Sequence, residues 1–375
     1  MRSGKYQIQL QGELAYKAFI PSLLPRKIKN DEELELLLSE ANLALGRLDG
    51  ISEIVPDIDF LTLMFGRKEA TYSSQVEGTQ ATFADVLKAE AKIEDKKIPY
   101  DVQEILNYIS AMNYGISRLK TLPLSLRLIK EIHKVLLSNV RGEERQPGEF
   151  RKSQNWIGGP TINTASYVPP PQNSLLDLLN NLETFLHSTE TLPLLIKTGI
   201  IHTQFENIHP FLDGNGRTGR LLVIFYLCYK KILQKPLLYL SVFFKKNQKE
   251  YYYRLNRVHE NDEIEEWLKF FLRGIIETSK QGFTTAQKIL KLRNIDYHKA
   301  TLLGRTTENG IKVVDSLFKN PFITIGGAVE ATKLSKKNAY LLLKRLQKIG
   351  ILYPIKNPKG LTSGYIYKEY LSLFD

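Results

Sequence analysis

HPFLDGNGRTGR, residues 209–220, is the segment from which the rest of this chain can be interpreted. Its three glycines, at 214, 216 and 219, let the backbone approach an anion closely, because no Cβ stands in the way. The apolar run RLLVIFYLCYKK begins at its last residue and is long enough to form a buried helix. The unpaired amides and the dipole at the N-terminus of that helix would favour phosphate. We therefore expect a phosphate-binding loop at the start of a helix.

Four side chains in this segment suit a reaction on a phosphate chain. Arg217 and Arg220 carry fixed positive charge and can each donate two hydrogen bonds to one anion. Asp213 is a hard oxygen ligand that suits Mg²⁺. His209 belongs to the residue type that titrates near neutral pH, so it can take a proton from a hydroxyl nucleophile.

Two other kinds of site compete for the same residues. Residues 214–219 also fit the dinucleotide pattern G-x-G-x-x-G, but that pattern must follow a buried strand. The preceding segment instead has apolar residues at helical spacing (195, 196, 200, 201, 205 and 208), and no Walker motif occurs. A zinc site at His202, Glu206 and His209 lacks the H-E-x-x-H spacing, so we expect His202 to be a packed histidine. A helix–loop–helix anion site is the prediction.

The segment resembles the signature of the Fic family, HPFx[DE]GNGRxxR, with every position filled. Further stretches are similar to other parts of long Fic proteins, and together they cover about residues 15–280: these are 16–25, 140–151, 154–159 and 167–171. The resemblance implies a mainly α fold, a Fic-type helical bundle with a short β-hairpin flap. β-formers around Gly158, Gly159 and Pro160 fit a hairpin over 155–168, whose edge would hold a target segment, although an ordinary surface hairpin has the same pattern.

Fic enzymes mostly transfer AMP from ATP to a hydroxyl of a target protein, which makes them nucleotidyltransferases. By resemblance, His209 would be the general base and Asp213 the Mg²⁺ ligand. Gly214, Asn215 and Gly216 would cradle the phosphates, Arg217 would contact the β-phosphate and Arg220 the γ-phosphate. A different nucleotide or phosphocholine donor stays open. So does a DNA-binding regulator that uses the Fic module only to sense a nucleotide.

Residues 245–255 are similar to the family's helix that helps to enclose the adenine. Asn247, Tyr252 and Tyr253 are the candidates there, because an amide and aromatic faces suit a base. Packing of the tyrosines in the core is an equally open interpretation.

Residues 73–78, SSQVEG, fit the family's inhibitory pattern [ST]-x-x-x-E-[GN] on a helix expected at about 67–78. The resemblance implies that Glu77 pairs with Arg220 and denies that arginine to the γ-phosphate, with Ser73 one turn earlier on the same face and Gly78 at the helix end. In some family members this Glu also helps to remove AMP from targets. A solvated helix that ends at Gly78 is the plain alternative.

The layout predicts three parts: a helical region at 1–120, the catalytic core at 121–280 and a basic module at 281–375. The helices expected in the first two parts are 31–48, 99–119, 123–137, 174–188, 193–207, 216–231, 249–259 and 262–279.

The basic module holds 16 Lys and Arg against 6 Asp and Glu, which gives +10 of the chain's +12. Three helical segments (313–320, 323–334 and 335–352) and two short strands within 353–371 resemble a winged helix-turn-helix. Binding of DNA and docking of a protein, either a target or a second copy, are both open.

Composition predicts a soluble protein, with 43% hydrophobic residues and a longest apolar run, about 221–229, too short to span a membrane. The first residues lack the apolar core of a secretory signal. Cys228 is the single cysteine, so no internal disulfide can form and a cytoplasmic location is expected. We expect an unidentified protein as substrate, with modification of the chain itself also open. A second copy in a homodimer is the other expected partner.

Overall fold

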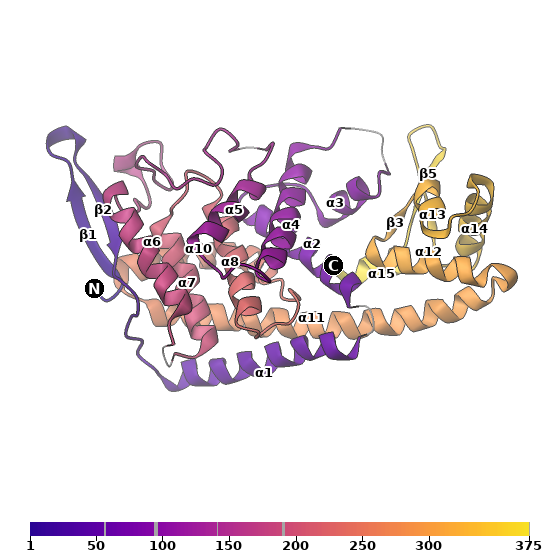
Figure 1. Ribbon diagram of the computed structural model, residues 1–375, viewed down its shortest axis with the longest axis horizontal. Helices are drawn as coiled ribbons and strands as arrows, with labels where there is room; N and C mark the ends of the chain where they lie inside the picture. The colour runs from indigo at the N-terminus through magenta and orange to yellow at the C-terminus, as the bar shows by residue number, and fades with distance from the viewer. Residues whose placement is uncertain (56–57, 94–96, 141, 190–191, 375) are drawn as a thin grey trace.

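Two long helices, α1 (Glu32–Ile54) and α11 (Ile264–Thr301), lie side by side along one edge of the molecule (Figure 1). They run in the same direction, because Lys269 near the start of α11 pairs with Asp31, the N-cap of α1, at 2.8 Å. The computed structural model describes residues 1–55, 58–93, 97–140, 142–189 and 192–374. Within them the fold is mainly helical, as predicted.

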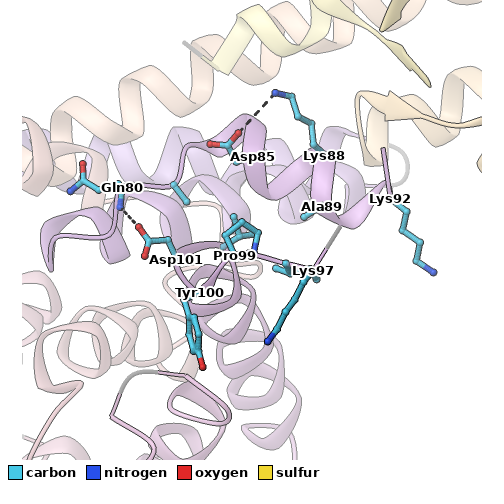
Figure 2. Close-up of a pocket in the computed structure, with 12 residues that line it drawn as sticks. Gln80, Asp85, Lys88, Ala89, Lys92, Lys97, Pro99, Tyr100 and Asp101 are labelled. Atoms are coloured by element: carbon cyan, nitrogen blue, oxygen red, sulfur yellow. Dashed lines mark hydrogen bonds and ion pairs between the residues drawn. The ribbon is translucent and has the colours of Figure 1, made fainter. Parts of the chain in front are cut away.

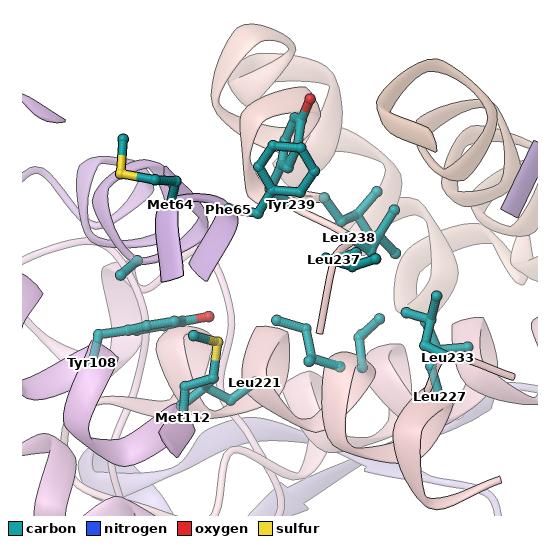
Figure 3. Close-up of a cluster of buried hydrophobic side chains, with 14 of the residues drawn as sticks. Met64, Phe65, Tyr108, Met112, Leu221, Leu227, Leu233, Leu237, Leu238 and Tyr239 are labelled. Carbon is teal, nitrogen blue, oxygen red and sulfur yellow. The ribbon is translucent and has the colours of Figure 1, made fainter. Parts of the chain in front are cut away.

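A helical bundle packs on this pair and surrounds α8 (Asn215–Tyr229), which is buried along almost its whole length. An apolar helix without a polar face is stable only when neighbours cover every side. Its apolar side chains belong to one buried cluster with Met64 and Phe65 of α2 (Asp59–Val76), Tyr108 and Met112 of α4 (Tyr100–Arg118) and side chains of the segment Leu233–Tyr239 (Figure 3). The other helices are α3 (Phe83–Glu90), α5 (Leu126–Leu136), α6 (Gln172–His187), α7 (Leu194–Ile208), α9 (Ser241–Lys246) and α10 (Gln248–Asn261).

Most of the expected helices are present within a few residues of their predicted ends. The predicted start at Pro123 was wrong, because α5 begins only after its N-cap Ser125, whose side chain accepts a hydrogen bond from Leu128 N. The predicted end at residue 279 was also wrong. Apolar residues at helical spacing (282, 286 and 289) continue the buried face, so α11 runs on to Thr301 and the expected boundary at 280/281 falls inside it.

Two β features differ from expectation. An unpredicted hairpin, β1 (Gly4–Gln9) with β2 (Tyr16–Pro21), occupies the N-terminus, and Phe19 N donates to Val168 O at the end of the flap. The flap itself is not a regular hairpin. It has one bridge, Ile157 to Tyr167, and a 3₁₀ turn at Ile162–Thr164. Gly158 and Gly159 adopt left-handed φ of +68° and +73°, and Pro160 has no N–H, so the ladder cannot continue.

The last part of the chain contains the three helices and two strands that the sequence predicts. These are α12 (Thr307–Lys319), α13 (Ile325–Thr332), α14 (Lys336–Lys348), β4 (Tyr353–Lys356) and β5 (Thr362–Ile366). An unpredicted strand, β3 (Phe322–Ile323), completes an antiparallel sheet of order β3-β5-β4. A short helix, α15 (Lys368–Leu371), and a 3₁₀ turn, Ser372–Phe374, end the described chain. Among the described helices, none has both the length and the apolar character to cross a bilayer.

Candidate active site

The loop between α7 and α8 is held by its own side chains. Asn215 brackets Phe211, because its Oδ1 accepts from Phe211 N and its Nδ2 donates to Phe211 O, each at 2.8 Å. The ring of His133 stacks on Phe211 with centroids 3.6 Å apart, and its Nε2 lies 2.9 Å from Asp213 O. The Asn215 amide, expected in the phosphate cradle, is therefore engaged within the loop. Its backbone N–H, in the first turn of α8, is the group left for an anion.

The N-terminus of α8 already has a carboxylate against it. Gly214 precedes the helix with φ +75°, and Gly216 lies in its first turn. A Cβ at Gly216 would lie 2.2 Å from Oε1 of Glu77. Glu77 thus sits where we expect a phosphate, beside backbone with positive partial charge.

Arg220 joins this carboxylate to α2. Its Nη2 donates to Glu77 Oε1 at 2.7 Å and to Ser73 O at 2.9 Å, and its Nε donates to Ser73 Oγ at 2.8 Å. α2 ends at Val76, and Gly78 leaves it with φ +103°. The structure therefore brings Ser73, Glu77 and Arg220 together, at the end of the helix on which the sequence placed the first two.

Both arginines of the signature have side-chain N–H groups that donate to no described residue. Nε and Nη1 of Arg217 and Nη1 of Arg220 are buried and have no hydrogen-bond partner among the described residues. Burial alone would raise the pKa of Glu77, but Arg220 and Arg217 hold that pKa below its ordinary value. Buried guanidinium donors without partners are costly. An anion with several oxygens would satisfy them.

His209 is the C-cap of α7, in the left-handed region at φ 49°, ψ 61°. Its Nδ1 is buried without a partner among the described residues. Burial, with a further contribution from Arg151, lowers the pKa of His209 to about 4. The expectation of titration near neutrality was therefore wrong. The imidazole is neutral at pH 7, which is the form that accepts a proton.

A cavity of about 540 Å³ connects these groups. Glu77, His209, Gly216 and Arg220 line one part, and the remaining lining includes Trp156, Tyr252, Leu255, Asn256 and His259. Of the three residues expected near the adenine, Tyr252 lines the cavity and the other two do not. Asn247 donates to Phe243 O at the α9–α10 junction, and Tyr253 is exposed, with Arg254 and Arg257 over its ring.

Asp213 lies beside the cavity rather than on its wall. Its side chain is 36% exposed, and Oδ1 is 3.7 Å from Arg217 Nη2. A Cβ at Gly142 would lie 2.8 Å from its Oδ2. Arg141, in the stretch that resembles the start of the flap, is outside the described residues.

His202 is packed, as predicted, because its ring nitrogens lie 3.1 Å from Gly219 O and 2.9 Å from the Tyr251 hydroxyl. No group of metal-ligating side chains occurs within the described residues. The expected role of Gly219 was wrong. A Cβ there would lie 2.2 Å from Oε1 of Glu206, so Gly219 makes room for a carboxyl group on α7.

Glu206 and Arg151 also belong to the site, although the sequence did not predict their roles there. Burial raises the pKa of Glu206 to about 8, so its carboxyl is protonated at the cavity wall. Arg151 is buried and donates to the carbonyl oxygens of His209, at 3.0 Å, and of Pro170, which joins the loop after α7 to the end of the flap. Position offered one signal: Glu206 stands one helical turn before His209.

A larger cavity of about 790 Å³ lies between α3 and the start of α4 (Figure 2). Both carboxylates of its lining serve the local fold, since Asp101 accepts from Gln80 N at 2.7 Å and Asp85 accepts from the backbone N of Thr82, the N-cap of α3, at 3.0 Å. None of the residues predicted for the site lines it.

Comparison with known proteins agrees with this geometry. Residues 36–117 match the Fic/DOC family N-terminal domain, and residues 123–227 match the Fic/DOC family domain. Protein adenylyltransferase Fic of Aedes aegypti is 28% identical over 271 residues, which are 70% of this chain and 50% of that protein. Its namesake in Drosophila virilis is 30% identical over 258 residues, 65% of this chain and 46% of that protein. The chain thus spans about half the length of these curated relatives.

Solved structures share the fold at lower identity. A Fic family protein from Desulfovibrio desulfuricans G20 superposes with a TM-score of 0.59 at 18% identity, over 91% of this chain and 97% of that one. A Fic-1 fragment from C. elegans gives a TM-score of 0.50 at 18% identity, over 69% of this chain and 74% of its own. The two matched domains, the related sequences and the filled signature at residues 209–220 lead to one conclusion: the chain belongs to the Fic family.

Proposed function

We propose that this chain is a protein adenylyltransferase that moves AMP from ATP to a Ser, Thr or Tyr hydroxyl of a protein, and that Glu77 holds it inactive. One observation carries the proposal: the Glu77 carboxylate pairs with Arg220 and touches Gly216 at the N-terminus of α8. A carboxylate and a phosphate compete for the same guanidinium donor, here Nη2 of Arg220. The relatives named protein adenylyltransferase support the reaction itself.

His209 would start the reaction. Its neutral imidazole takes the proton of the target hydroxyl, and the hydroxyl oxygen forms a bond to the α-phosphorus of ATP. The bond from that phosphorus to the bridging oxygen breaks, so pyrophosphate leaves and the proton stays on His209. The backbone amides at the start of α8 and the donors of Arg217 that have no partner among the described residues would face the charge on the phosphates.

Asp213 would hold Mg²⁺, and its surroundings fit that ion. It is the carboxylate of the loop, it is partly exposed, and Arg217 lies 3.7 Å away. Mg²⁺ in phosphate sites commonly takes one or two carboxylates and completes its shell with phosphate oxygens and water. The ion would neutralise charge on the leaving pyrophosphate. Asp213 Oδ1 accepts from Gly214 N at 2.6 Å, which orients the carboxylate within the loop.

The remaining cavity would receive the nucleoside and the target. Tyr252 and Leu255 offer an aromatic and an apolar surface to a base, and Asn256 and His259 add polar atoms beside them. The flap residues Trp156 and Ile157 are about two-fifths exposed at the cavity rim. Backbone groups of this irregular flap would hold the segment that carries the hydroxyl, whether it comes from another protein or from a second copy of the chain.

Intact-mass spectrometry after incubation with ATP and Mg²⁺ tests the proposal, with cell lysate as a source of acceptors. Charged hydrogen bonds contribute about 1.5–3 kcal/mol each, so Glu77→Gly should raise the rate of AMP transfer by roughly ten- to a hundredfold. Adding His209→Ala to that variant should lower the rate by about two to four orders of magnitude.

Glu13→Gly is the matched control, because it removes the same charge from an exposed turn. Its rate should equal that of the unaltered chain. Equal labelling of Glu77→Gly with and without His209 would contradict the reaction. Equal labelling of the unaltered chain and Glu77→Gly would contradict the inhibition alone.

A further inference from the structure

Positive charge is concentrated in one part of the chain that the proposed reaction does not use. Residues 281–375 contribute +10 of the net +12, so the first 280 residues are nearly balanced. From residue 331 to residue 367 there are eight Lys and Arg and no Asp or Glu. Such a run needs a reason other than solubility, because like charges on one small unit repel one another.

Most of this charge lies on one face of α14. The buried face packs on its neighbours through Ala339, Leu342, Leu343 and Leu346. The opposite face is exposed and carries five basic residues: Lys336, Lys337, Lys344, Arg345 and Lys348. Asn338, Tyr340 and Leu341 are exposed as well, and the last two are 41% and 46% accessible. The face therefore combines fixed charge with groups able to contact a flat polar or apolar edge.

The charges at the start of α14 oppose the helix dipole. Lys336 and Lys337 occupy the first turn after the N-cap Ser335, where the dipole is positive and acidic residues are favoured. Lys336, Lys337 and Lys348 form no ion pair with any residue that the structure describes. An external anion at this end of the helix would relieve both costs.

The neighbouring elements present α14 outward. A turn of three residues, 333–335, joins α13 to α14, and Lys333 in it has φ +61°. The β4–β5 connection projects from the same part of the molecule and carries exposed Lys356 and Lys359 (Figure 1). Asn357 Oδ1 accepts from the backbone N of Lys359, at 3.0 Å, and of Leu361, at 2.9 Å, which fixes the loop. α14 stands at the far end of the molecule from β1 (Figure 1).

We propose that residues 307–366 form a winged helix-turn-helix that binds duplex DNA with α14 in the major groove. The order helix, strand, helix, helix, strand, strand supports this arrangement. The lysines of α14 and of the β4–β5 loop contact phosphates, which sets affinity. Asn338, Tyr340 and Leu341 lie between them and face the base edges, where an amide can read adenine and an apolar group can contact the thymine methyl.

Fluorescence anisotropy with the full chain and a labelled 30-base-pair duplex tests this surface. We expect binding at 50 mM salt that weakens linearly as log K against log salt. Lys336→Glu with Lys337→Glu should lower the affinity at least tenfold and reduce the salt slope by about two, one for each lost phosphate contact. The control is Lys288→Glu with Lys291→Glu, which makes the same charge change at exposed positions of α11. It should change the affinity less than threefold.

Three results would overturn the proposal: no binding to the duplex at 50 mM salt, an equal loss in both double variants, or tighter binding to single-stranded RNA of the same length. Circular dichroism melting of both variants checks that they fold. AMP transfer by Glu77→Gly is measured in parallel. It distinguishes failure of this DNA-binding surface from failure of the proposed transferase.

Discussion

Lys68 Nζ donates a hydrogen bond of 2.5 Å to the carbonyl oxygen of Phe374, which ties the end of the described chain to helix α2. Both residues are buried. The Phe374 ring also packs against Phe65 of α2, with centroids 6.2 Å apart, and against Phe83 at the start of α3, at 5.5 Å. Glu77 caps the same α2. The basic module therefore touches the helix that carries the proposed inhibitory contact.

Removing this anchor should weaken the inhibition. Phe374→Ala deletes the buried ring and leaves a cavity beside α2, so the end of the helix is held less tightly against Arg220. We expect AMP transfer to rise severalfold in the chain that retains Glu77. In the Glu77→Gly background the same substitution should leave the rate unchanged, because no carboxylate remains to be displaced. Initial rates of the four chains measure the coupling directly.

Leu361→Ala is the control, since it trims a side chain that is 65% exposed in the β4–β5 loop. A severalfold rise in that variant, or the same rise from Phe374→Ala in both backgrounds, would show that the tail does not act through Glu77.

The loop between α7 and α8 could be predicted because its contacts are local. Asn215 binds Phe211 four residues away, and the signature leads directly into the buried α8. The pairing of Glu77 with Arg220 joins residues 143 apart and was expected only from family resemblance. Most helices could be predicted from the spacing of their apolar residues, because the helical period places residues at that spacing on one face, which becomes buried.

The features that sequence did not predict depend on contacts between distant segments. Gly219 has the pattern of a phosphate-loop glycine, yet its neighbour is Glu206 of another helix. The lowered pKa of His209 depends on burial beside Arg151, which no spacing reveals. The extension of α11 past residue 279 buries its apolar residues against α1, where Leu48 lies beside Gly282. Tertiary packing, rather than propensity, decides each of these cases.

The protonation of His209 provides a direct check of the site. Because its pKa is lowered to about 4, the imidazole should stay neutral from pH 8 down to about pH 5. The unfolded chain binds this proton near pH 6.5, whereas the folded chain does not. The free energy of unfolding therefore decreases as pH falls below that value. An NMR titration should show its ring signal, assigned by its absence in His209→Asn, unchanged across this range. A midpoint near 6.5 would contradict the buried, neutral base.

Glu206 should make stability fall with rising pH. Burial raises its pKa to about 8, while the unfolded chain loses that proton near 4.5. The folded state therefore binds the extra proton between these values, and stability decreases as pH rises from about 4.5 to 8. Glu206→Gln keeps the shape and stays neutral. We compare the free energy of unfolding in urea of this variant with that of the unaltered chain. The difference should shift in favour of Glu206→Gln by more than about 1 kcal/mol between pH 5 and pH 8.5. Glu13→Gln, on an exposed turn, should show no such gain, and a pH-independent difference for Glu206→Gln would contradict the prediction.

The contact between α4 and α8 can be tested with two identical substitutions. A Cβ at Gly115 of α4 would lie 2.3 Å from Cζ of Phe225 on α8, and that ring is enclosed in the core. Gly115→Ala should therefore overpack the bundle and lower the free energy of unfolding by about 1–3 kcal/mol.

Gly46 lies within α1, and its Cβ would meet nothing within 4 Å. Gly46→Ala should be neutral or stabilise the chain by up to about 1 kcal/mol, since alanine favours a helix more than glycine does. Urea unfolding followed by circular dichroism measures both changes. Equal effects of the two substitutions would show that α4 and α8 do not approach as closely at Gly115 as described, and the position of α8 beneath Glu77 would need to be revised with them.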